Sequence, residues 1–93
     1  MFEGVPEEEL WEKTHSEDLG ERSDALIELG ERKVQEEDWL MAKNLFGSAA
    51  DILDGLDREV DLTRAIYSMG FCQYRLDEGQ DAIQTLKLSL IHI

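Results

Sequence analysis

The residues of this chain that could support chemistry are few, and they lack the neighbours that a reaction needs. His15 lies among carboxylates, but no second histidine follows at helical spacing, as it does in helical metal sites. Cys72 is the single cysteine, so an internal disulfide is excluded. No histidine lies near it in the sequence to activate the thiol. We therefore expect a solvated histidine and a small buried thiol.

A row of carboxylates follows the middle of the chain and invites a calcium interpretation. Asp51, Asp54, Asp57 and Asp61 are spaced three or four residues apart. A calcium loop needs alternating ligands and a central glycine, and this spacing does not provide them. No phosphate-binding loop or nucleophile–base pair is present either. We expect a solvated helix face, with no catalytic residues, no metal and no cofactor.

Composition narrows the class of partner. The chain has 93 residues, enough for one small domain. Its formal charge of −13 disfavours nucleic acid and anionic membrane surfaces as direct partners. No apolar run is long enough to span a bilayer, and the acidic N-terminus does not resemble a signal peptide. A cytoplasmic protein is the expectation.

The stretch 25–49 predicts a helical hairpin. Apolar residues recur at helical spacing on both sides of Asp38-Trp39, at Leu26, Leu29, Ala42, Leu45, Phe46 and Ala49. Gly30 in mid-helix costs about 1 kcal/mol relative to alanine, and a close approach of two helices is the compensation that we expect. We predict helices over 23–37 and 39–55, with Asp38 as the cap of the second and Gly55 at its end.

The pattern returns after forty residues. Gly30 falls on Gly70 and Ala42 on Ala82. The other matched pairs are Ala25 with Ala65, Leu26 with Ile66, Leu29 with Met69, and Phe46 with Leu86. Self-similarity of this kind indicates stacked units that bury their apolar faces on one another. We predict a third helix over 60–77 and a fourth from Gln80 onward, with Gly79 in the turn.

These residues resemble the tetratricopeptide repeat family. The first unit carries Leu29-Gly30, Asp38-Trp39, Ala42, Phe46 and Ala49, and the second carries Met69-Gly70, Leu76, Gly79, Ala82-Ile83 and Leu86. The chain departs from the family in its forty-residue period against about 34, in Asp54 where proline is frequent, and in Lys33 and Gln73 where large apolar residues are usual. The resemblance implies an all-α fold of antiparallel helix-turn-helix repeats, a solenoid fragment with repeats at 23–56 and 60–87.

The resemblance also implies a concave groove, lined by the first helix of each repeat, that holds a peptide. In the second repeat the candidate groove residues are Arg64, Tyr67, Phe71, Tyr74 and Arg75. The matching residues of the first repeat are Asp24, Ile27, Glu31, Val34 and Gln35. Aromatic residues and arginine dominate interface hot spots. The alternative is that the aromatics belong to the core or contact a third repeat. The family's clamp for carboxylate termini is not expected, because Ile27 and Glu31 occupy its positions.

Residues 1–22 form an acidic leader. Pro6 and the three glutamates after it favour a helix start, and we predict a short helix over Pro6–Lys13 that caps the first repeat through Trp11. Ser16 is the expected cap of the helix that follows. A partner-binding acidic arm is the alternative.

The last six residues, Leu88–Ile93, match the in-frame translation of a transposon end sequence used to prepare sequencing libraries. The repeat supports this interpretation, because His92 falls where Ile52 continues an apolar helix face. We expect a non-native tail at 88–93, so that the chain is a truncated fragment. A genuine hydrophobic terminus is the alternative.

The functional expectation is therefore a protein–protein interaction module that binds a peptide or partner helix as an adaptor, not an enzyme. One alternative is the N-terminal sensor or docking part of a longer regulatory or signalling protein. Another is a small structural homodimer, in which two hairpin pairs complete each other's core.

Overall fold

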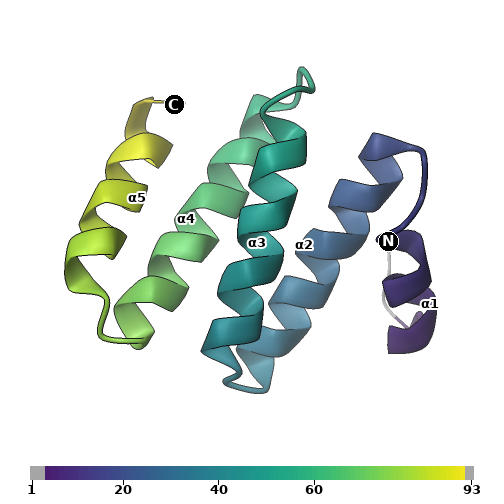
Figure 1. The fold of residues 1–93 in the computed structure, drawn as a ribbon, viewed down its shortest axis with the longest axis horizontal. Helices are drawn as coiled ribbons and strands as arrows, with labels where there is room; N and C mark the ends of the chain where they lie inside the picture. The colour runs from purple at the N-terminus through teal and green to yellow at the C-terminus, as the bar shows by residue number, and fades with distance from the viewer. Residues whose placement is uncertain (1–3, 92–93) are drawn as a thin grey trace.

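The computed structural model describes residues 4–91 of the chain, and the side chains of residues 4–88. The described residues form five α-helices and no strand, so the all-α prediction is confirmed. The helices are α1 (Glu7–Lys13), α2 (Leu19–Gln35), α3 (Trp39–Leu53), α4 (Glu59–Arg75) and α5 (Gly79–Ile91). They lie side by side in chain order, with α1 and α5 at opposite ends of the row (Figure 1).

Each helix packs chiefly on the next one in the sequence. The main contacts join α1 with α2, α2 with α3, α3 with α4, and α4 with α5. Helices α2 and α3 form one hairpin, and α4 and α5 form a second beside it (Figure 1). This arrangement of successive hairpins agrees with the repeat-like architecture predicted from the forty-residue period.

The apolar positions that follow helical spacing form the core. Two adjoining clusters of buried side chains run through the row of helices. The larger consists of Leu10, Ala25, Leu26, Leu29, Leu45, Ala49, Leu53, Leu62, Ala65 and Ile66. The smaller consists of Ala42, Phe46 and Cys72. Both clusters include residues of α3 and α4, so buried apolar contacts join the first hairpin to the first helix of the second.

Both hairpin turns are built in the same way. Helix α2 ends through hydrogen bonds from the N–H groups of Glu37 and Asp38 to the carbonyl oxygens of Val34 and Lys33. Asp77 and Glu78 make the equivalent bonds at the end of α4. This is the Schellman motif, which places one residue in the left-handed region. Glu37 and Asp77 take that conformation here, with φ of 60° and 62°.

Several predicted helix boundaries were wrong. Helix α2 begins at Leu19 and not at residue 23, and its cap is Asp18, whose Oδ1 accepts a hydrogen bond from the N–H of Glu21. Ser16 instead accepts a hydrogen bond from the N–H of Asp18. Asp38 caps α3 as predicted, by accepting from Met41.

Neither glycine expected at a helix boundary acts as predicted. Helix α3 ends at Leu53, before Gly55. Gly79 is the first residue of α5 rather than part of the turn. The reason is that Asp77, not glycine, supplies the left-handed residue of this turn.

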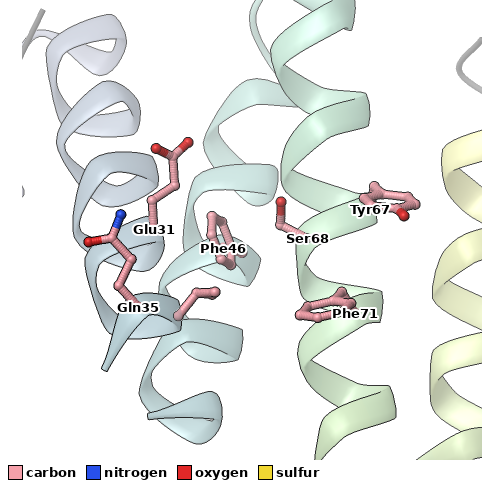
Figure 2. Close-up of a pocket in the computed structure, with 7 residues that line it drawn as sticks. Glu31, Gln35, Phe46, Tyr67, Ser68 and Phe71 are labelled. Atoms are coloured by element: carbon pink, nitrogen blue, oxygen red, sulfur yellow. The ribbon is translucent and has the colours of Figure 1, made fainter. Parts of the chain in front are cut away.

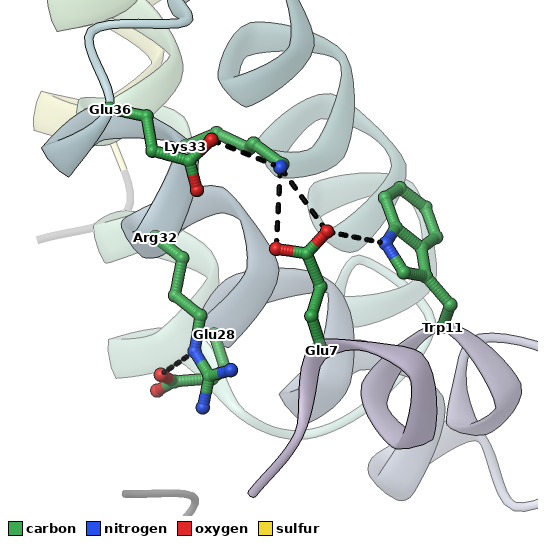
Figure 3. A network of polar contacts seen from close by, with 6 residues as sticks. All are labelled: Glu7, Trp11, Glu28, Arg32, Lys33 and Glu36. Carbon is green, nitrogen blue, oxygen red and sulfur yellow. Dashed lines mark hydrogen bonds and ion pairs between the residues drawn. The ribbon is translucent and has the colours of Figure 1, made fainter. Parts of the chain in front are cut away.

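The leading helix α1 packs against α2, but Trp11 is not its principal anchor. Leu10 is fully buried, whereas Trp11 is only partly buried against the core. The Trp11 indole N–H donates to Glu7 Oε2, and Lys33 Nζ of α2 donates to Glu7 Oε1 at 3.3 Å (Figure 3). Together these two donors hold the pKa of Glu7 below its usual value. Lys33 stands where the resembled family favours a large apolar residue. In this chain it forms an ion pair with Glu7 of the leading helix α1.

Two further observations concern the chain as a whole. None of the described helices is both long enough and apolar enough to cross a membrane. Helix α5 continues through Ile91, whereas His92 and Ile93 lie outside the described residues. The expected foreign origin of residues 88–93 stays a prediction.

Candidate functional site

A hollow of about 320 Å³ lies between α2 and α4. Helices α2 and α4 supply its two walls, and α3 contributes Phe46 between them (Figure 2). The lining residues are Glu31, Val34, Gln35, Phe46, Tyr67, Ser68 and Phe71. The hollow thus combines an apolar centre with polar groups at its margins, which is the usual make-up of a site that holds a ligand side chain.

A second, more charged hollow of about 270 Å³ continues between the same two helices toward their other ends. It shares Glu31 with the first, and its lining residues are Asp24, Ile27, Glu28, Glu31, Arg58, Asp61 and Arg64. Four carboxylates therefore face two guanidinium groups. We call the two hollows together the α2/α4 groove.

The arginines of the groove are tied to its walls. Arg58 Nη2 lies 2.7 Å from Asp24 of α2 and 2.6 Å from Asp61 of α4. Arg64 Nη2 lies 3.2 Å from Glu31 across the groove. Burial raises the pKa of Glu31, and the nearby Arg64 opposes that rise. The Arg64–Glu31 pair remains substantially exposed, so it contributes little to stability and its groups are accessible to a ligand.

Six of the eight predicted site residues line the α2/α4 groove. Helix α2 supplies three of them and α4 the other three, in the set Ile27, Glu31, Val34, Arg64, Tyr67 and Phe71. Their intervals of three and four residues place each set along one helix face. The forty-residue repeat brings the two faces opposite each other.

Tyr74 and Arg75 do not line this groove. The Arg75 guanidinium lies over the Trp39 ring, 5.0 Å from its centroid. Phe71 meets the same indole edge-to-face, with ring centroids 5.7 Å apart. Arg75 is therefore engaged in a cation–π contact at the turn between α2 and α3. Tyr74 faces a different hollow, between α4 and α5.

This third hollow has a volume of about 320 Å³ and an almost wholly apolar lining. Its residues are Tyr67, Gly70, Phe71, Tyr74, Gly79, Ala82, Ile83 and Leu86. We call it the α4/α5 face. Tyr67 and Phe71 line both this face and the α2/α4 groove, and Figure 2 shows the Tyr67 ring on the side of α4 toward α5. The aromatics thus form a ridge between two surfaces.

The two side chains that were considered for chemistry, His15 and Cys72, do not line any of these three hollows. His15 is exposed, as predicted. Cys72 is fully buried, and burial raises the pKa of its thiol to about 11. Such a thiol carries almost no thiolate near neutral pH. Among residues 4–91, no group of three or more His, Cys, Asp or Glu side chains could hold a metal ion.

Sequence reasoning missed five residues of the groove, which are Phe46 and Ser68 in the first hollow and Glu28, Arg58 and Asp61 in the second. Ser68 was not singled out, although its spacing of four residues from Arg64 indicates the same helix face. Phe46 was assigned to the core, where most of its ring lies, yet part of the ring also lines the hollow. Helical spacing could have identified Ser68, whereas the double role of Phe46 required the packing of three helices.

Comparisons of this chain with protein-family models, curated proteins and solved structures find no match. The resemblance to tetratricopeptide repeats therefore stays a prediction.

Proposed function

We propose that this chain is a tetratricopeptide-like protein-interaction module that binds a peptide segment of a partner in the α2/α4 groove. The observation that carries this proposal is the placement of six predicted residues on facing walls of one groove, with Tyr67 59% and Phe71 41% exposed. Large aromatics left in contact with water favour an interaction surface.

The groove also suggests which peptides fit. The apolar centre at Val34, Phe46 and Phe71 suits an aliphatic or aromatic anchor side chain. The adjoining hollow has more carboxylates than guanidinium groups, and Glu31 is partly desolvated there. A lysine or arginine on the ligand can pair with these carboxylates. We therefore propose a peptide with an apolar anchor and flanking basic residues.

The role of adaptor follows from the same interpretation and fits an acidic chain of charge −13, since such a charge speeds association with basic partners. The cytoplasmic location stays a prediction from the sequence.

The test is selection of binders from a random peptide library displayed on phage, with the full 93-residue chain as bait. Enriched peptides are synthesised and their affinity is measured by fluorescence anisotropy. We expect enrichment of sequences with an apolar anchor beside basic residues. Glu31→Lys should weaken their binding by at least about tenfold, which corresponds to ~1.4 kcal/mol.

A matched control makes the same charge change elsewhere. Glu12 is exposed on α1, away from the groove, so Glu12→Lys should change affinity by less than about twofold at physiological salt, where distant charges are screened. Equal weakening by both substitutions would show that only overall charge matters. Failure to enrich any peptide that depends on Glu31 would contradict the proposal.

A further inference from the structure

The two walls of the α2/α4 groove carry opposite charges where its two hollows meet. Glu31 of the α2 wall lines both hollows (Figure 2), and Arg64 of the α4 wall lines the second. Arg64 Nη2 lies 3.2 Å from Glu31 Oε1. This ion pair therefore spans the groove at the point that a peptide must cross in order to occupy both hollows.

The other charged groups of the second hollow already have close partners. Arg58 holds Asp24 of the α2 wall at 2.7 Å and Asp61 of the α4 wall at 2.6 Å. Glu28 accepts a hydrogen bond of 3.0 Å from Arg32, one turn further along its own helix. A ligand gains little from these groups, because taking one member of a close pair leaves the other without its partner.

Among the ion pairs of the second hollow, Glu31–Arg64 is the most exposed. The Arg64 side chain is 62% exposed and that of Glu31 is 45% exposed, so little stability is lost when the pair opens. Arg64 also lies 4.0 Å from Asp61, which Arg58 already binds more closely. Partial burial raises the pKa of Glu31, and Arg64 does not offset the rise. The Glu31 carboxylate therefore gains from a further cation.

An extended peptide in the groove presents its side chains to the two walls in turn. Successive side chains of an extended strand point to opposite sides, so residues that are adjacent in the ligand face different helices. A basic side chain directed at α2 meets Glu31. The next side chain, directed at α4, meets Arg64 and is favoured as a carboxylate. The complex then has two ion pairs across the interface in place of one within the protein.

We propose that the α2/α4 groove selects a peptide in which a basic and an acidic residue are adjacent, with the basic side chain on Glu31 and the acidic one on Arg64. This inference rests on the proposed function and specifies its ligand. The two charges keep fixed positions relative to the apolar anchor of the peptide, because the anchor hollow and the ion pair are built on the same two helices.

The test is a second selection, from a phage library of short peptides that have one central leucine and Lys, Glu or Ser at every other position. The bait is the full chain, and the enriched peptides are sequenced. We expect Lys and Glu to be enriched at adjacent positions, at least about fivefold over the unselected library, since charge complementarity acts mainly on specificity. Each should have its own fixed distance from the leucine.

The decisive variant exchanges the two charges of the groove. Glu31→Arg combined with Arg64→Glu keeps the net charge and allows an ion pair across the groove, but it reverses which wall is acidic. We expect the enriched positions of Lys and Glu to exchange places. Attraction to the acidic surface as a whole predicts no exchange, because the charge of the chain is unchanged.

A matched control exchanges the charges of Lys13 and Glu21, which lie 3.7 Å apart on α1 and α2 and do not line the groove. Lys13→Glu with Glu21→Lys should leave the enriched positions as they are. Circular dichroism and thermal melting check that both double variants are folded. Two single variants give an independent readout, because Glu31→Gln should lose the enrichment of Lys and Arg64→Gln that of Glu.

The outcomes separate this inference from the proposed function. Enrichment of Lys without Glu, or charge positions that stay in place in the Glu31→Arg, Arg64→Glu variant, would overturn the inference and leave the groove a peptide site. An exchange of positions in the control as well would also overturn it. So would failure of this library when the random library yields peptides that depend on Glu31. Failure of both libraries would overturn both proposals.

Discussion

The ring of Phe46 in α3 packs directly on the backbone of Gly30 in α2. A Cβ atom added to Gly30 would lie 2.8 Å from two carbon atoms of that ring. Phe46 is 2% exposed, so the ring has little space into which it can move. The glycine in mid-helix is therefore required by the approach of α3.

Gly30→Ala should destabilise the protein by about 1–3 kcal/mol, because overpacking outweighs the gain in helix propensity of ~1 kcal/mol. Gly70→Ala is the matched substitution forty residues later. There the nearest atom is Leu86 Cδ2, at 2.9 Å, the end of a flexible and only partly buried side chain. We expect a clearly smaller loss in urea denaturation. Equal losses would contradict the distinction between a fixed ring and a movable side chain.

Replacing the left-handed residue of each hairpin turn by glycine should stabilise the protein. Glu37 and Asp77 adopt φ of 60° and 62°, which disfavours any residue with a Cβ atom. Glu37→Gly and Asp77→Gly should each raise the free energy of unfolding by roughly 0.5–1 kcal/mol. Glu36→Gly is the control. Glu36 has φ of −83°, which any residue adopts, so glycine there should lower the free energy of unfolding. A loss of stability in all three variants would refute this prediction.

Cys72 makes stability depend on pH in the alkaline range. Burial raises the pKa of its thiol from 9.0 to about 11 in the folded protein. The unfolded thiol therefore ionises first, and the free energy of unfolding falls as pH rises from about 9 to about 11. The loss attributable to this group is on the order of 2 kcal/mol.

The measurement is urea denaturation at several pH values for the native chain and Cys72→Ala. The alanine variant has no thiol to ionise, so its stability should fall less steeply across this interval. Parallel curves would show that Cys72 does not carry the effect. Below pH 8 the two curves should be parallel.

Gln73, like Lys33, stands where the resembled family favours a large apolar residue. Its Oε1 atom is buried and makes no hydrogen bond with the described residues. Gln73→Met keeps the unbranched shape and removes the unpaired oxygen, so we expect a gain of about 1 kcal/mol in stability. Gln84→Met, at an exposed position of α5, should have no effect beyond about 0.5 kcal/mol. No gain in Gln73→Met would indicate that water satisfies this oxygen.

The two tyrosines of α4 should separate binding from folding. Tyr67 and Tyr74 are 59% and 67% exposed, so each alanine substitution should cost less than about 1 kcal/mol in stability. Tyr67→Ala should weaken peptide binding in the α2/α4 groove, whereas Tyr74→Ala should not, because only Tyr67 lines it. Large losses of stability in thermal melting would assign both residues to the core instead.

Much of the fold could be predicted from apolar spacing and the forty-residue repeat. Both are visible in the sequence. Gly30 and Gly70 also mark the places where helices approach closely, and Asp38 marks the start of a helix. The boundaries at Leu19 and Leu53 could not be predicted in the same way. Asp18 and Ser16 are both good caps, and their choice depends on local geometry that residue type does not determine.

Helical spacing was enough to predict the part of the candidate site that lies along single faces of α2 and α4. Residues at intervals of three and four along α2 and α4 were placed on facing walls. Arg75 was not, because its position depends on the ring of Trp39, a residue on another helix. Tyr74 lies on the same helix as Tyr67 and Phe71, but only the position of α5 shows that it lines the α4/α5 face and not the groove.

The packing of each helix chiefly on its neighbour in sequence also determines how the chain reaches its folded state. Contacts between neighbouring helices close short loops, so little chain entropy is lost before each contact forms. Proteins dominated by such local contacts fold within microseconds to milliseconds. Among the described residues, α1 and α5 each pack chiefly on one other helix, so their amide hydrogens should exchange with solvent before those of α3.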